Sequence, residues 1–201
     1  MNKIITVGRE LGSGGRELGR RLAETLGYEY YDKEIITEIS KRTELSEKYV
    51  RQVVENNPHE LFPITIGHSF TYIDAYALER KQSVFREQEN VLKEMAEKSD
   101  CVIVGRCADY ILKDYKPYRI FVCASMKSRV ERCREHENAE GNDVPDKKLI
   151  KMIKSVDKNR ASYYEFCTGR VWGDKLNYDL CVNTTDADMK ATVEMIAKLF
   201  K

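Results

Sequence analysis

Glycine and arginine residues near the start of the chain form a pattern that can bind an anion. The β-branched run Lys3–Val7 leads into the turn Gly12–Gly15, and Arg16 follows that turn. Apolar residues then recur at helical spacing from Leu18 to Leu26. Glycines let several backbone N–H groups converge, and a helix N-terminus adds partial positive charge. The stretch therefore predicts a phosphate site between a strand and a helix.

We interpret this stretch as a modified phosphate-binding loop, or P-loop. Arg16 stands at the loop exit, where the standard motif carries lysine. Alignment on this residue keeps Gly15 in place, but Glu10 replaces the first glycine and Glu17 replaces the magnesium-binding hydroxyl. Two alternatives stay open, namely the turn of a dinucleotide-binding fold and a tight turn made only for packing.

Composition restricts the class of protein. The length of 201 residues fits one domain, 1–201, and 34 Lys plus Arg against 33 Asp plus Glu argues against a dedicated nucleic-acid binder. No apolar run approaches the length of a membrane span, the first residues show no secretory pattern, and the six cysteines include no CxxC pair. We expect a reduced, cytoplasmic protein with neither nucleic acid nor membrane as partner, and the oligomeric state stays open.

Strand-like and helical segments alternate along the chain. This pattern predicts an α/β fold in which a parallel five-stranded sheet is covered by helices on both faces. The expected strands are Lys3–Val7, Glu29–Asp32, Cys101–Val104, Arg119–Ala124 and Tyr178–Val182. The expected helices are Gly15–Leu26, Lys33–Arg42, one capped by Ser46, Ala75–Lys98, a short one at 108–112, Met126–His136 capped by Ser125, Asp146–Phe166 and Asp186–Phe200. The segment Asn56–Ile73 is either a substrate-side loop or a surface loop.

Five segments in combination resemble the nucleoside monophosphate kinases, and among them the cytidylate-kinase-like branch. They are Gly8–Glu17, Tyr31-Asp32-Lys33-Glu34, Val102–Ala108 with its Gly105-Arg106 pair, Asp157-Lys158-Asn159-Arg160-Ala161, and Thr168–Leu180. The resemblance covers nearly the whole chain. It implies a P-loop kinase sheet with a helical acceptor-binding region at 33–98 and a lid and hinge region at 137–177.

The resemblance also implies roles for individual residues. Cytidylate kinases follow their third strand with Gly-Arg-Asp, whose arginine holds the acceptor phosphate, and this role carries to Arg106. Cys107 replaces the aspartate, which leaves part of acceptor recognition open. The family's Asp-Arg-Asn-Arg-Ala lid segment implies that Arg160 contacts the transferring phosphates and that Asp157 orients it. Lys158 stands where the family often has another arginine.

Phosphoryl transfer needs aligned phosphates and neutralised charge more than covalent help from the protein. Arginine suits this task because it binds bidentately and stays charged. The expected catalytic residues are Arg16, Arg106, Asp157 and Arg160. The expected cofactors are ATP, on Gly12, Ser13, Gly14, Gly15, Arg16 and Glu17, and Mg²⁺, with Glu17 and Asp32 as candidate ligands. The expected acceptor-binding residues are Asp32, Arg106 and Arg86.

Each of these residues also has a structural interpretation. Arg16 could pair with Glu17 or Glu10, and Arg106 could simply end a strand. Arg160 and Asp157 could be a solvated pair on a helix, which contributes little to stability.

The expected function is ATP-dependent phosphoryl transfer to a small phosphate acceptor, a nucleoside monophosphate resembling CMP or dCMP. The alternatives are a kinase for another small metabolite and a non-catalytic nucleotide-binding sensor or scaffold. A dinucleotide-dependent oxidoreductase is disfavoured because Gly105-Arg106 and the lid-like segment have no role in that chemistry.

Overall fold

The computed structural model describes residues 2–55, 75–139 and 144–200. Its core is one parallel sheet of five strands in the order β2-β3-β1-β4-β5. The strands are β1 (Ile4–Arg9), β2 (Glu29–Tyr31), β3 (Cys101–Val104), β4 (Tyr118–Cys123) and β5 (Leu180–Asn183). The predicted fold class is confirmed. The predicted loop at 56–73 lies outside the described residues, and the subdivision into acceptor and lid regions stays a prediction.

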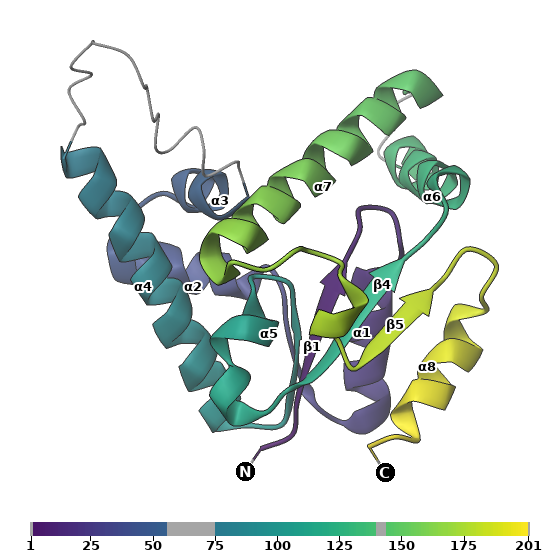
Figure 1. Cartoon of the computed structure of the whole chain (residues 1–201), viewed down its shortest axis with the longest axis horizontal. Coiled ribbons are helices and arrows are strands. Elements are labelled where there is room, and N and C mark those ends of the chain that lie inside the picture. Colours follow the sequence, from purple (N-terminus) through teal and green to yellow (C-terminus); the bar gives the residue numbers. More distant parts are fainter. Residues whose placement is uncertain (1, 56–74, 140–143, 201) are drawn as a thin grey trace.

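Helices connect the strands and cover the sheet (Figure 1). They are α1 (Gly15–Leu26), α2 (Glu34–Thr43), α3 (Glu47–Glu55), α4 (Ala75–Lys98), α5 (Ala108–Ile111), α6 (Met126–Ala139), α7 (Asp146–Thr168) and α8 (Met189–Ala197), with short 3₁₀ turns η2 (Lys113–Tyr115) and η3 (Lys175–Asn177). None of the described helices combines the length and the apolar character needed to cross a membrane.

Burial on both faces explains the apolar strands. All four residues of β3 are buried, as expected for a parallel sheet covered on two sides. One face packs on α1 and α8 through a core that contains Ile5 and Leu22. The other face packs on α2, α3, α4, α5 and α7 through a core that contains Ile103 and Leu92. Helix α6 packs instead on α7, through a third cluster around Val130. The alternation of side chains along each strand thus separates two hydrophobic cores.

Capping residues fix several helix ends. Gly27 ends α1 with φ 71°, and its N–H bonds Ala23 O and Glu24 O, as the sequence predicts. Ser46 and Ser125 accept backbone N–H groups at the starts of α3 and α6. The last helix begins later than predicted, at Met189, because the Asp188 carboxylate caps its first turn.

The sheet topology brings two connecting loops together. β1 lies between β3 and β4, so the loops that follow β1 and β3 emerge side by side at the carboxyl edge of the sheet. Helix α7 passes over this edge, whereas both chain termini lie at the opposite edge (Figure 1). Ligands of open α/β sheets bind at the carboxyl ends of the strands, so this edge is where a site is expected.

We predict that Leu22→Ala lowers the free energy of unfolding by about 2–5 kcal/mol, because it opens a cavity in the core under α1. Leu22 is 0% exposed, whereas Leu176 is 81% exposed. Leu176→Ala is therefore the matched control and should change stability by less than about 0.5 kcal/mol. Urea unfolding followed by circular dichroism measures the free energy of unfolding of both variants. Equal losses would contradict the assigned packing.

Candidate active site

Glycine is required at several points of the loop between β1 and α1. Gly12 and Gly14 have φ of 76° and 77°, in the left-handed region that other residues rarely adopt. A Cβ on Gly12 would also lie 2.7 Å from the carbonyl oxygen of Arg129, which is too close for any side chain. The loop therefore packs tightly under α6 while its backbone turns back on itself.

The N-terminus of α1 opens at the end of this loop. Gly14, which has no side chain to offer a cap, occupies the N-cap position. The first N–H groups of a helix have no intrahelical acceptor, and the helix dipole places partial positive charge there. The backbone from Gly14 to Glu17 thus has the geometry that the sequence predicts for an anion site.

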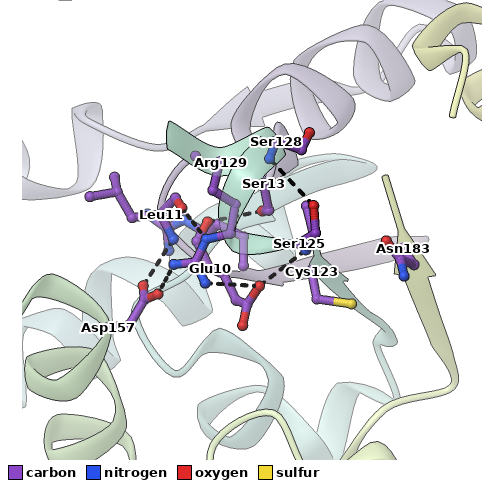
Figure 2. Close-up of polar contacts among 12 residues, drawn as sticks. Glu10, Leu11, Ser13, Cys123, Ser125, Ser128, Arg129, Asp157 and Asn183 are labelled. Atoms are coloured by element: carbon purple, nitrogen blue, oxygen red, sulfur yellow. Dashed lines mark hydrogen bonds and ion pairs between the residues drawn. The ribbon is translucent and has the colours of Figure 1, made fainter. Parts of the chain in front are cut away.

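Arg129 of α6 and Asp157 of α7 hold the loop in place (Figure 2). Arg129 Nε donates to the carbonyl oxygen of Leu11 at 2.7 Å, and the Leu11 N–H donates to Asp157 Oδ1 at 2.9 Å. The Arg129 guanidinium also pairs with Asp157 and, at 3.3 Å, with Glu10. Glu10 in turn accepts the N–H of Ala124. The glutamate that replaces the first P-loop glycine is therefore a structural anchor.

A second anchor comes from Arg132 and the segment after β5. Arg132 donates to the carbonyl oxygens of Gly12 and Thr184, at 3.3 and 2.6 Å. The buried Thr184 hydroxyl donates to the carbonyl oxygen of Ser13 at 2.6 Å. The Ser13 hydroxyl donates within the loop, to the Glu10 carbonyl oxygen at 2.9 Å. The loop conformation is thus fixed from α6 and from the carboxyl end of β5.

Arg160 lies where α7 meets the end of β1. Its Nη1 donates to the carbonyl oxygen of Arg9 at 3.1 Å and lies 3.5 Å from Asp157 Oδ1. The alternative of a solvated helix pair is wrong, because both side chains are mostly buried and contact the loop. Asp157 orients Arg160 only in part, since it also binds Leu11 and Arg129.

Asp32, just after β2, is a buried carboxylate that faces arginines. It is 3% exposed, and its Oδ2 lies 2.5 Å from Arg16 Nε. Its Oδ1 lies 3.8 Å from Arg9 Nη2 and has no hydrogen-bond partner in the described part of the chain. Arg16 therefore pairs with Asp32, and the alternatives of pairing with Glu17 or Glu10 are wrong.

Arg9, which sequence reasoning missed, is the central cation of the site. Burial, together with the charges of Arg160 and Arg106, lowers the pKa of Arg9 to about 9, although Asp32 opposes the shift. Its guanidinium fills the space beside Gly105, where a Cβ would lie 1.7 Å from Arg9 Nη1. The charges of Arg16, Arg106 and Arg160 thus all act on Arg9, and this concentration of positive charge favours an anion. The available signal was an arginine at the carboxyl end of the first strand.

Arg106 lies in a strained turn after β3. Gly105, Arg106 and Cys107 have φ of 75°, 61° and 53°, and a left-handed conformation costs a non-glycine residue about 1–3 kcal/mol. The buried Gln88 holds the turn, because its Nε2 donates to the Arg106 carbonyl oxygen at 3.2 Å. Tyr163 of α7 donates its hydroxyl to Gln88 Oε1 at 3.0 Å. Helices α4 and α7 therefore fix the turn that carries Arg106.

Two predicted site residues lie apart from this group. Glu17 is half-exposed and pairs with Arg21 at 2.7 Å, and Arg86 is exposed on α4. Among the described residues no group of three or more His, Cys, Asp or Glu side chains is arranged to hold a metal ion. The structure brings together Arg16, Asp32, Arg106, Asp157 and Arg160, and it adds Arg9, Arg129, Arg132 and Gln88.

A model of the cytidylate kinase-like family matches residues 4–186. The chain belongs to this family. The predicted resemblance is confirmed, and family membership marks the chain as a kinase of a nucleotide or another small molecule. A relative named cytidylate kinase, from Methanopyrus kandleri, is 26% identical over 192 residues, which cover 90% of this chain and 84% of the relative.

Solved structures support the same fold. An uncharacterised protein from Eubacterium ventriosum is 27% identical with a TM-score of 0.68, and the match covers 98% of both chains. Shikimate kinase from Bacteroides thetaiotaomicron is 17% identical with a TM-score of 0.54, again over 98% of both chains. The second likeness shows only that the cytidylate kinase-like chain shares its fold with other P-loop kinases.

We predict that inorganic phosphate raises the melting temperature of the protein, because it neutralises the charge around Arg9. At a phosphate concentration about ten times the Kd, binding should raise the free energy of unfolding by ~1.4 kcal/mol. Differential scanning calorimetry measures the shift. Arg9→Met should lose most of the shift, whereas Arg119→Met should keep it, because Arg119 pairs with Asp179 at the start of β4. Equal shifts in the two variants would contradict an anion site at Arg9.

Proposed function

We propose that this chain transfers the γ-phosphoryl group of ATP to a nucleoside monophosphate, with CMP or dCMP as the acceptor. The observation that carries the proposal is the group of four arginines whose charges meet at Arg9, two of which face Asp32. Family membership and the relative from Methanopyrus kandleri support the choice of a pyrimidine nucleotide.

The donor phosphates bind at the N-terminus of α1. The N–H groups from Gly14 onward face the anion, as in other glycine-rich loops that precede a helix. Arg16 replaces the usual lysine and, since its side chain is 57% exposed, it can turn from Asp32 toward a phosphate. The anchors Arg129 and Asp157 keep the loop open for ATP without contacting it.

The acceptor phosphate binds between the two loops. Arg106 holds it from the turn after β3, and Arg9 approaches it from the end of β1. Arginine suits this role because its guanidinium can donate two parallel hydrogen bonds to one phosphate. The strain in the turn is the local cost of directing Arg106 toward the same region as Arg9.

Arg160 serves both substrates during transfer. Its Nη1 donates from α7 to the carbonyl oxygen of Arg9 at the end of β1, so it lies beside the start of the loop that follows this strand. As negative charge spreads over the transferring group, a fixed guanidinium stabilises it more than it stabilises the bound substrates. Asp157 keeps Arg160 directed toward the loop, and the scheme requires no general base.

Of the two predicted magnesium ligands, Asp32 is the one that faces the site, and its Oδ1 is buried without a hydrogen-bond partner in the described residues. Because Arg9 and Arg16 already face this carboxylate, magnesium would fit there only together with the phosphates of ATP, whose charge offsets the added cation. Glu17 does not fit, because it turns away to Arg21. Bound with ATP, magnesium would neutralise phosphate charge.

We predict that one pyrimidine monophosphate stimulates ADP release from Mg-ATP. The purified protein is incubated with CMP, dCMP, UMP, AMP or GMP, and ADP is measured by a coupled assay. Stimulation by CMP or dCMP above the protein-alone background supports the proposal. Stimulation only by another class of acceptor, such as a hydroxylated sugar acid, would support a kinase activity but contradict a nucleotide as the acceptor. Nucleotide binding without turnover for any acceptor would favour a sensor or scaffold.

We predict that Arg16→Ala lowers kcat by about 100-fold or more, because the transferring phosphates lose a charged partner. Arg20→Ala is the matched control, since Arg20 lies one turn further along α1 and pairs with Glu24 in solvent. It should keep kcat within about two-fold of the wild type. Steady-state kinetics with the acceptor identified in the panel measures both variants. Equal kcat values for the two would contradict a catalytic role for Arg16.

A further inference from the structure

Two cysteines next to the site contact each other. Cys107 is the last residue of the strained turn that carries Arg106, and Cys167 lies near the end of α7. Their thiols are hydrogen-bonded, and both side chains belong to the same hydrophobic core. Cys107 is also the residue that departs from the Gly-Arg-Asp pattern, so the kinase chemistry leaves it without a role.

The thiol pair completes a ring of buried polar contacts. The Cys167 thiol interacts with the Tyr163 hydroxyl, which donates to Gln88 Oε1 at 3.0 Å. Gln88 donates to the Arg106 carbonyl oxygen, and the chain then continues directly into Cys107. Any change in the distance between the two sulfurs therefore acts on the turn that directs Arg106.

Cys167 is the more accessible member of the pair. It lines a cavity of about 500 Å³ between α4, α5 and α7, together with Phe85, Tyr110 and Phe166. Cys107 does not line this cavity and is only 5% exposed. A small reagent can thus reach the Cys167 sulfur before it reaches the sulfur of Cys107, which contacts Cys167.

The surroundings also favour Cys167 as the first nucleophile. The hydrogen bond with Cys107 lowers the pKa of the Cys167 thiol, although burial opposes this. At Cys107, by contrast, the same hydrogen bond and burial raise the pKa of the thiol well above its usual range. Since the thiolate is the reactive form, Cys167 is the better nucleophile of the two at neutral pH.

We propose that Cys107 and Cys167 form a redox-modification site that a small-molecule disulfide oxidises to an intramolecular disulfide. The Cys167 thiolate attacks one sulfur of the reagent, forms a mixed disulfide and releases one reagent thiol. Cys107 then loses its proton to solvent, attacks the Cys167 sulfur and releases the second reagent thiol. The protein gives up two electrons and two protons, and the reagent takes them up as two thiols.

The bond would act on acceptor binding. A disulfide holds its sulfurs about 2.0 Å apart, closer than two hydrogen-bonded thiols, so Cys107 must shift toward α7. The strained turn shifts with it and misdirects Arg106. We expect KM for the phosphate acceptor to rise by about 10-fold or more, since displacements near 1 Å have effects of that order. This consequence rests on the proposed function, whereas formation of the disulfide does not.

To test this, the reduced full-length protein is oxidised with glutathione disulfide, and the remaining thiols are alkylated. Tryptic peptides are then mapped by mass spectrometry. We expect a linked pair of peptides containing Cys107 and Cys167, which dithiothreitol separates. Alkylation of both cysteines, or a mixed disulfide that persists on Cys167, would overturn the proposal. Because the map needs no kinase activity, its outcome is independent of the proposed function.

Three serine variants sharpen the test. Cys167→Ser and Cys107→Ser should each lose the linked peptides, and KM of the Cys167→Ser protein should not respond to the oxidant. Cys181→Ser is the control, because Cys181 is exposed on β5 and should react with glutathione without affecting the pair. If Cys107→Ser fails to fold, Cys167→Ser still tests the pairing, because Cys167 is partly exposed and its substitution disturbs the core less. Linked peptides that persist in Cys167→Ser would overturn the pairing.

Discussion

The positive charge gathered around the buried carboxylate of Asp32 is the constraint on which the site depends. Arg16 and Arg9 face this carboxylate, and the charges of Arg106 and Arg160 reach Arg9 as well. Because like charges repel one another in a partly desolvated site, an anion bound among these guanidinium groups would stabilise the arrangement.

Holding those charges together requires rigid support from elements that are distant in the sequence. Asp157 binds Leu11 of the loop, Arg129 of α6 and Arg160 of its own helix. Helix α7 is thus part of the loop's foundation as well as a cover over the strand ends. Any movement of α7 that releases Asp157 would also loosen the loop between β1 and α1.

The end of α7 also contacts the turn after β3. Tyr163 reaches the turn of Arg106 through Gln88, and Cys167 reaches it through Cys107. The helix therefore contacts the loop after β1 near its middle and the turn after β3 near its end. The replacement of aspartate by Cys107 places a thiol at this second contact, which is where a covalent link would have the largest effect on Arg106.

Sequence alone determined the α/β class, the five strands and the glycine loop, because side-chain periodicity and the φ requirements of glycine are local properties. The glycine loop singled out Arg16, and the family resemblance singled out Arg106 and Arg160, as predicted site residues. Only the tertiary structure decided what those side chains face. Arg129 and Gln88 act through partners far away in the chain, so no local pattern marks them, whereas the local signal for Arg9 was its place at the carboxyl end of the first strand. Glu10 becomes an anchor because α6 brings Arg129 beside it, and Cys107 acquires a partner because α7 ends next to the turn after β3.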